Sequence, residues 1–186
     1  EFSYLDKTSS PTLKVLEILI PSNSSYTVES KSLKIYLNSF YKKKFSNETD
    51  VLIRIKKDLD KLTQSEIKIK FVNNFQEAPE CIVLNSCKLF KTKANKPICF
   101  RGFRSVCPVT SQPDYANIYI FTDALMDVKW LKKYLASFKE RGEFHEQCIQ
   151  DIFETISTKY SSNSLEVAGR FMRRGGIDIN PIRSNK

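Results

Sequence analysis

The sequence predicts an α+β fold built from two similar modules. The chain has 186 residues and 41% of them are apolar, enough for a globular core. Strand-like and helix-like patterns follow each other in the order strand, helix, helix, strand, and this order occurs twice. Residues 36–40 (YLNSF) also nearly repeat at 134–138 (YLASF). We therefore expect a duplicated module in which two helices pack on one face of a sheet.

The first module is predicted from four segments. Residues 13–20 are rich in branched apolar side chains and partly alternate, which is typical of a strand. Apolar residues at helical spacing cover 33–40 and again 52–62. Candidate N-caps of the second helix are Asn47 and Thr49. Lysines alternate with apolar residues over 67–71, which indicates a half-buried strand.

The second module repeats this order. No element can be placed within 73–104. An apolar strand covers 118–121, and helical spacing recurs over 131–138 and over 144–156. A final strand and its glycine turn are expected within 165–176.

The boundaries follow from this division. We expect the first module in residues 1–100 and the second in residues 101–186. A sheet covered on one face needs its remaining edges paired, so we expect a homo-oligomer, a dimer or higher.

Charge and cysteine content narrow the function classes. The net charge of +9 suggests an anionic partner, although the run Lys42–Lys44 is more simply a solvated surface. No apolar run reaches the roughly 18 residues of a membrane span, and no secretory signal pattern is present. Five cysteines without a CxxC motif, beside a single histidine, argue against a zinc site. An odd number of thiols fits a reducing cytoplasm.

The segment Cys107–Asp114 is the sharpest candidate for chemistry. Proline after Cys107 stiffens the chain, and a turn can bring the Asp114 carboxylate back to the thiol. A free thiol is only about 3% ionised at pH 7, so a nucleophilic cysteine needs a neighbour that lowers its pKa or takes its proton. The alternative is a small buried cysteine with an aspartate in a turn.

His145 and Glu146 form the second candidate. His145 is the only side chain whose ordinary pKa lies near neutrality, so it is the candidate for a proton relay. Glu146 could accept two N–H donors from a guanine-like edge. Both residues could instead be ordinary residues at the start of a helix.

Two further segments could bind phosphates. Glu29-Ser30-Lys31 opens a helix, where Ser30 or Ser32 could simply be the N-cap. Arg174 stands beside Gly175, where the backbone can approach a ligand closely, although a plain turn explains the glycine equally well. No GxGxxG fingerprint occurs, so a dinucleotide would be bound outside a Rossmann site.

Four segments in order resemble the QueF family, the nitrile reductases of queuosine biosynthesis. They are Glu29–Tyr36, Cys107–Asp114, Glu143–Cys148 and Arg173–Pro181. They are similar to the family's signature, nucleophile, substrate and cofactor segments. The signature lies in the first half and the nucleophile in the second, as in the longer two-module subfamily. Between Phe71 and Arg104 the chain looks shorter than that subfamily.

The resemblance implies the tunnelling fold (T-fold), with tandem ββααββ modules that form barrels on oligomerisation. It implies NADPH-dependent reduction of the nitrile of 7-cyano-7-deazaguanine to the aminomethyl group, through a covalent thioimide. The partner would be a small molecule rather than nucleic acid or membrane, and no metal is implied. Covalent capture divides a four-electron reduction into easier steps, and the cofactor supplies hydride.

The resemblance also implies the site residues. Cys107, Asp114 and His145 would be catalytic; Val28, Glu29, Ser30, His145 and Glu146 would bind the substrate; and Ser30, Lys31, Arg174 and Gly175 would bind NADPH.

Three other functions stay open from the residues alone. An amidinotransferase-like enzyme would keep Cys107 and Asp114 but act on a deazaguanine base in tRNA, and would not need the signature segment. A non-catalytic nucleobase- or RNA-binding module would show salt-sensitive binding without turnover. A zinc cyclohydrolase is disfavoured because one histidine leaves too few ligands.

Overall fold

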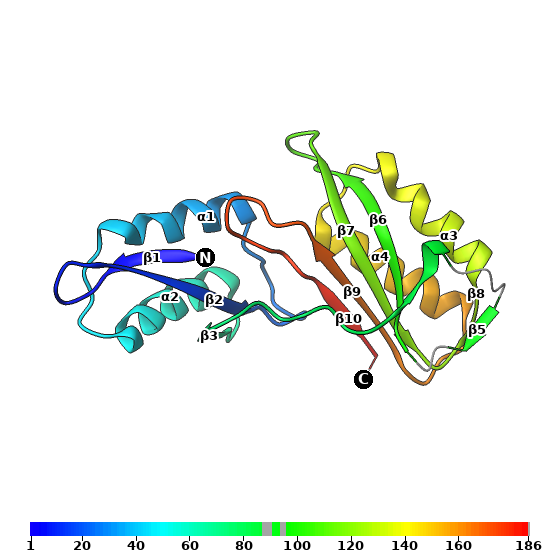
Figure 1. Ribbon diagram of the computed structural model, residues 1–186, viewed down its shortest axis with the longest axis horizontal. Helices are drawn as coiled ribbons and strands as arrows, with labels where there is room; N and C mark the ends of the chain where they lie inside the picture. Colours follow the sequence, from blue (N-terminus) through cyan, green and yellow to red (C-terminus); the bar gives the residue numbers. More distant parts are fainter. Residues whose placement is uncertain (87–90, 94–95, 186) are drawn as a thin grey trace. The chain divides into compact units, whose positions relative to one another are not determined.

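The computed structural model describes residues 1–86, 91–93 and 96–185, and its chain divides into two compact units. Unit 1 consists of Glu1–Glu77 and Arg174–Ile177, and unit 2 of Ala78–Arg173 and Asp178–Lys186. Both units combine helices with antiparallel strands (Figure 1), so the predicted α+β class is confirmed.

Unit 1 is a three-stranded antiparallel sheet with two α-helices. The elements are β1 (Phe2–Leu5), β2 (Pro11–Leu19), α1 (Ser30–Asn38), the 3-10 helix η1 (Ser39–Lys42), α2 (Glu48–Thr63) and β3 (Lys68–Val72). The strand order is β1-β2-β3. Its core joins Val51, Ile55 and Leu59 of α2 to Phe2 and Tyr4 of β1, all buried. The helical stripe of α2 is therefore buried by packing on the sheet.

Unit 2 has a five-stranded sheet. Its elements are β4 (Ile82–Val83), η2 (Leu84–Ser86), β5 (Lys91–Lys93), β6 (Ile98–Val106), β7 (Pro113–Thr122), β8 (Leu125–Asp127), α3 (Val128–Ala136), η3 (Ser137–Glu140), α4 (His145–Lys159), β9 (Leu165–Phe171) and β10 (Ile182–Ser184). The sheet order is β10-β9-β7-β6-β4, and β5 pairs with β8. The buried residues of α3 and α4 share one core with β6, β7 and β9.

The internal repeat is visible within the two units. Each has two antiparallel strands, a short helix, a 3-10 turn, a long helix and a returning strand, with orders β1-β2-β3 and β6-β7-β9. Phe40 and Phe138 of the repeated pentapeptides are fully buried. In both copies the pentapeptide serine donates to a tyrosine carbonyl oxygen at 2.7 Å. The matched sequence therefore encodes the same local structure twice.

The structure contains strands that the sequence analysis did not place, namely β1, β4, β5, β6, β8 and β10. Of these, β4, β5 and most of β6 lie within the 73–104 stretch. Residues 78–100 fall in unit 2, because β4 pairs in parallel with β6, so the boundary lies after Glu77 rather than after residue 100. Asn47 is the N-cap of α2, as expected. The N-cap of α1 is Glu29, not Ser30 or Ser32.

Within the described part of the chain, none of the helices combines the length and apolar character that a membrane span requires.

Candidate active site

The β6–β7 hairpin positions the cysteine. The Cys107 N–H donates to the Gln112 carbonyl oxygen at 2.8 Å, and the Ser111 N–H donates to the Cys107 carbonyl oxygen at 2.9 Å. Ser111 adopts the left-handed conformation, with φ of 57°, which closes this short loop. Cys107 therefore sits, half-buried, where β6 enters the turn.

Hydrogen bonds favour the thiolate form of Cys107. Burial raises the pKa of this thiol, but the Thr110 hydroxyl and the N–H groups of Thr110 and Val109 donate to the sulfur and outweigh burial. The Asp114 charge opposes them, yet the resulting pKa lies below the ordinary cysteine value. A lowered pKa increases the thiolate fraction at neutral pH, as a nucleophile requires.

Asp114 and His145 form a polar pair in the same unit. Asp114 is the second residue of β7 and lies opposite Ser105 in β6. Its Oδ2 atom is 3.2 Å from Nε2 of His145, and the two side chains are 8% and 18% exposed. The His145 ring stacks on Phe171, with 3.9 Å between centroids and 17° between planes. A carboxyl group next to an imidazole, close to a thiol, can give and recover a proton.

Glu146 follows His145 in the first turn of α4. The side chain is half-buried. A carboxylate at the start of a helix is favoured by the helix dipole, and it can also accept two N–H donors from a planar ligand. The structure thus brings Cys107, Asp114, His145 and Glu146 into one unit.

The signature segment lies in unit 1. The Glu29 carboxylate accepts from the N–H of Lys31 and of Ser32, both at 2.7 Å, and from the Ser32 hydroxyl at 2.8 Å. Hydrogen bonds from the Lys31 N–H and the Ser32 hydroxyl lower the pKa of Glu29. Val28 is half-buried against the unit 1 core. Glu29 is therefore a fixed, ionised group at the start of α1.

The glycine turn belongs to the same unit. Arg174 and Ile177 exchange backbone hydrogen bonds at 3.1 and 3.2 Å, and Gly175 has φ of 57°. A Cβ atom on Gly175 would overlap the side chain of Lys34 in α1. Glycine is favoured here by its left-handed conformation, whereas the flexible end of the Lys34 side chain could move away from a Cβ atom. Unit 1 thus contains the four cofactor candidates Ser30, Lys31, Arg174 and Gly175.

The other described cysteines are free thiols in different surroundings. Burial raises the pKa of Cys148 to about 12, so this residue is a neutral thiol. Burial and the neighbouring Cys81 raise the pKa of Cys99. Cys87 lies outside the described residues. Cys107 thus differs from Cys99 and Cys148, because its pKa is lowered whereas theirs are raised.

Sequence reasoning missed three contributors to this site. Thr110 lies inside the quoted nucleophile segment but was not given a role. Phe171 and Arg141 gave no sequence signal, because the Phe171 stack on His145 and the ion pairs of Arg141 depend on tertiary packing.

Comparison with known proteins gives matches over both halves of the chain. The family model described as "Nitrile reductase, 7-cyano-7-deazaguanine-reductase N-term" matches residues 1–71, and that of "QueF-like protein" matches residues 113–186. The chain is 36% identical to the NADPH-dependent 7-cyano-7-deazaguanine reductase of Buchnera aphidicola, covering 100% of this chain and 79% of that protein. It is 34% identical to the reductase of the same name from Desulfotalea psychrophila, over 99% and 75%.

A solved structure was also found, the archaeosine synthase QueF-Like in the apo form. The match has a TM-score of 0.44 and 18% identity, and covers 53% of this chain and 95% of that one. Since the two named reductases match essentially the whole chain and both family models match in order, this protein belongs to the QueF family of NADPH-dependent 7-cyano-7-deazaguanine reductases.

Proposed function

We propose that this chain reduces the nitrile of 7-cyano-7-deazaguanine to the aminomethyl group of 7-aminomethyl-7-deazaguanine, a step of queuosine biosynthesis, with NADPH as reductant. One structural observation supports this most directly. A cysteine of lowered pKa lies in the same unit as a buried carboxyl paired with the chain's single histidine, in a member of this family.

The first step is addition to the nitrile. The Cys107 sulfur attacks the nitrile carbon, a C–S bond forms, and one π bond of the nitrile opens towards nitrogen. The Asp114 carboxylate takes the proton of the Cys107 thiol and delivers it to the nitrogen, which gives a neutral thioimide. His145 is the neighbouring group that can return a proton to Asp114.

The substrate would be held through its guanine-like edge. In unit 2, Glu146 would accept its N–H groups, with His145 beside it. In unit 1, Glu29 is the candidate acceptor, with Val28 and Ser30 beside it. A carboxylate offers about four lone-pair positions, and in Glu29 they accept from the Lys31 and Ser32 N–H groups and the Ser30 and Ser32 hydroxyls, so the substrate would replace one of the hydroxyl donors. The lowered pKa of Glu29 keeps this acceptor ionised.

The donor set of unit 1 fits the phosphates of NADPH. Lys31 and Arg174 are cationic, Ser30 has a hydroxyl, and Gly175 leaves backbone accessible beside Lys34. When bound, NADPH supplies the two hydrides of the reduction. The residues of unit 1 bind and orient it.

We further propose a homo-oligomer in the cytoplasm. In unit 2 the core contains the residues of α3 and α4 that face the sheet, while β10 and β4 are its outermost strands. Four described free thiols fit a reducing compartment. Light scattering after gel filtration tests the oligomer, and a monomer with full activity would contradict it.

The deciding experiment follows NADPH oxidation by absorbance, with and without 7-cyano-7-deazaguanine. Wild type is compared with Cys107→Ala and with a matched control, Cys81→Ala. We expect substrate-dependent oxidation in wild type and in the control, and none in Cys107→Ala. An adduct without oxidation would instead favour the amidinotransferase-like function. If the folded protein shows neither adduct nor NADPH oxidation, a non-catalytic binding module is favoured.

A further inference from the structure

The segment Arg141–Glu143 pairs with the strand that leads to Cys107 and continues into α4, whose first turn carries His145 and Glu146. Both backbone polar groups of Val106, the residue before the nucleophile, pair with this segment. The Val106 N–H donates to the Arg141 carbonyl oxygen at 2.9 Å, and the Glu143 N–H donates to the Val106 carbonyl oxygen at 3.1 Å. The same segment leads directly into α4, which begins at His145. Its conformation thus sets the distance between Cys107 and the first turn of α4.

That first turn is not held by a side-chain cap. Phe144 is the N-cap residue of α4 and makes no side-chain cap hydrogen bond. The other α-helices of the described chain begin with Glu29, Asn47 and Asp127, and each of these side chains accepts from a backbone N–H of its helix. Some other interaction must fix the start of α4.

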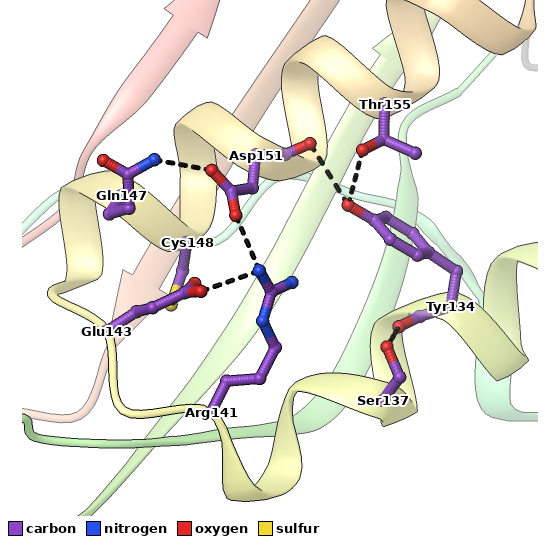
Figure 2. A network of polar contacts seen from close by, with 8 residues as sticks. All are labelled: Tyr134, Ser137, Arg141, Glu143, Gln147, Cys148, Asp151 and Thr155. Carbon is purple, nitrogen blue, oxygen red and sulfur yellow. Dashed lines mark hydrogen bonds and ion pairs between the residues drawn. The ribbon is translucent and has the colours of Figure 1, made fainter.

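Arg141 supplies such an interaction (Figure 2). Its Nη2 atom lies 2.7 Å from Oε1 of Glu143, before the helix, and 2.8 Å from Oδ2 of Asp151, inside it. Gln147 donates to the other Asp151 oxygen at 2.6 Å. The guanidinium carbon lies 4.3 Å from the centroid of the buried Phe138 ring, which anchors Arg141 on the core.

The repeat provides an internal comparison. Lys43 of unit 1 corresponds to Arg141, and its amino group also lies over the buried phenylalanine, 4.5 Å from the Phe40 centroid. Phe45 is equivalent to Glu143, because the N–H of each donates to the residue of the preceding strand. Alignment of the helix starts places Arg54 opposite Asp151. Neither Phe45 nor Arg54 can form the acidic side of this clamp. The cation–π contact is therefore shared, whereas the two carboxylates occur only in the copy that carries the nucleophile.

We infer that Arg141, through Glu143 and Asp151, is a positioning residue that holds the His145–Glu146 turn of α4 in register with Cys107. This inference rests on the proposed function for the consequence in catalysis. Its structural part concerns only the place of His145. Small displacements of reacting groups slow a reaction steeply. Loss of the clamp therefore slows covalent addition strongly, while it lowers the free energy of unfolding only slightly.

The test uses Arg141→Met, which keeps much of the apolar stem but removes the guanidinium, and Arg141→Lys, which restores a cation. Arg54→Met is the matched control, because Arg54 pairs with Asp58 at 2.9 Å in the corresponding helix of unit 1. Two quantities are measured for the full chain. One is the rate of adduct formation with 7-cyano-7-deazaguanine. The other is the position of the imidazole ring resonances, which belong to His145 alone because the chain has one histidine.

We expect Arg141→Met to slow adduct formation about 10- to 100-fold, to move the His145 resonances, and to be partly rescued by Arg141→Lys. Arg54→Met should change neither, while both Met variants lower Tm by no more than about 4 °C. Unmoved resonances and a wild-type rate in folded Arg141→Met would overturn the inference, as would equal changes in Arg54→Met.

A second variant and the two readouts separate the hypotheses. If Arg141→Met does not fold, Asp151→Asn removes the acceptor charge with little change of volume and should give the same two changes. If wild type forms no adduct, the proposed function fails, and the His145 resonances alone decide whether Arg141 positions α4.

Discussion

The imidazole Nε2 atom of His145 lies 3.2 Å from Oδ2 of Asp114, although the two residues come from α4 and β7. Burial of a carboxyl group is costly unless it is paired, and His145 provides a partner while its ring stacks on Phe171. The hairpin brings Asp114 close enough to the thiol for its charge to act on Cys107. The Asp114–His145 pair thus connects α4 to β7 and acts on the nucleophile Cys107 through the charge of Asp114.

Asp114→Asn should separate thiol reactivity from nitrile addition. Burial is the largest influence that raises the pKa of Cys107, and the Asp114 charge adds to it, so the variant should lower this pKa further. Alkylation by iodoacetamide at neutral pH should therefore speed up or stay unchanged. Adduct formation should fall about 10²- to 10⁴-fold, because the amide cannot supply the proton. Asp123→Asn is the control, and a wild-type adduct rate in Asp114→Asn would refute this proton donor.

Thr110→Val tests the hydrogen bonds to the sulfur. The pKa of Cys107 is held below its ordinary value by Thr110 and Val109 donors, against the effect of burial. Removing the hydroxyl withdraws stabilisation from the thiolate, so the pKa rises and the midpoint of the alkylation rate moves to higher pH. Initial alkylation rates between pH 5 and 9 measure this midpoint, with Thr158→Val as a surface control. An unchanged midpoint would contradict the role of Thr110.

The repeated helices could be read from the sequence because their signals are local. Phe40 and Phe138 fall on helical stripes, and both are fully buried. Asn47 was recognised as a cap because its side chain needs only the backbone three residues on, where it accepts from Asp50 at 2.9 Å. Periods of a few residues are fixed by the chain itself and survive folding.

The missed features depend on partners far along the chain. Strand β6 is interrupted in its pattern at Arg101 and Gly102, and its pairing with β7 shifts register between Phe100 and Phe103. A bulge of this kind breaks the period-two alternation that marks a strand. The Phe171–His145 stack likewise exists only because β9 runs beneath α4, which no local pattern shows.

Lys31→Ala should weaken the binding of NADPH without changing the rate of adduct formation. Lys31, at the start of α1, is proposed to contact only the cofactor, whereas Cys107 forms the adduct. Loss of one charge-assisted phosphate contact should raise the KM for NADPH about 10-fold. Adduct formation without NADPH should stay at the wild-type rate. Lys57→Ala, an exposed lysine of α2, is the control. An unchanged KM for NADPH would remove Lys31 from the cofactor site.

Gly169→Ala should damage the fold and the site together. A Cβ atom at position 169 would lie 2.8 Å from Cδ1 of Ile149 and 2.9 Å from Cε2 of Phe171, so both side chains must move. Overpacking of this kind costs about 1–3 kcal/mol of unfolding free energy, measured by urea titration. Because Phe171 supports the His145 ring, adduct formation should slow as well. Gly142→Ala is the control for unfolding free energy alone, since a Cβ there meets nothing within 4 Å. If Gly169→Ala were as stable and as active as wild type, β9 would not be packed against α4 closely enough to hold His145 in place.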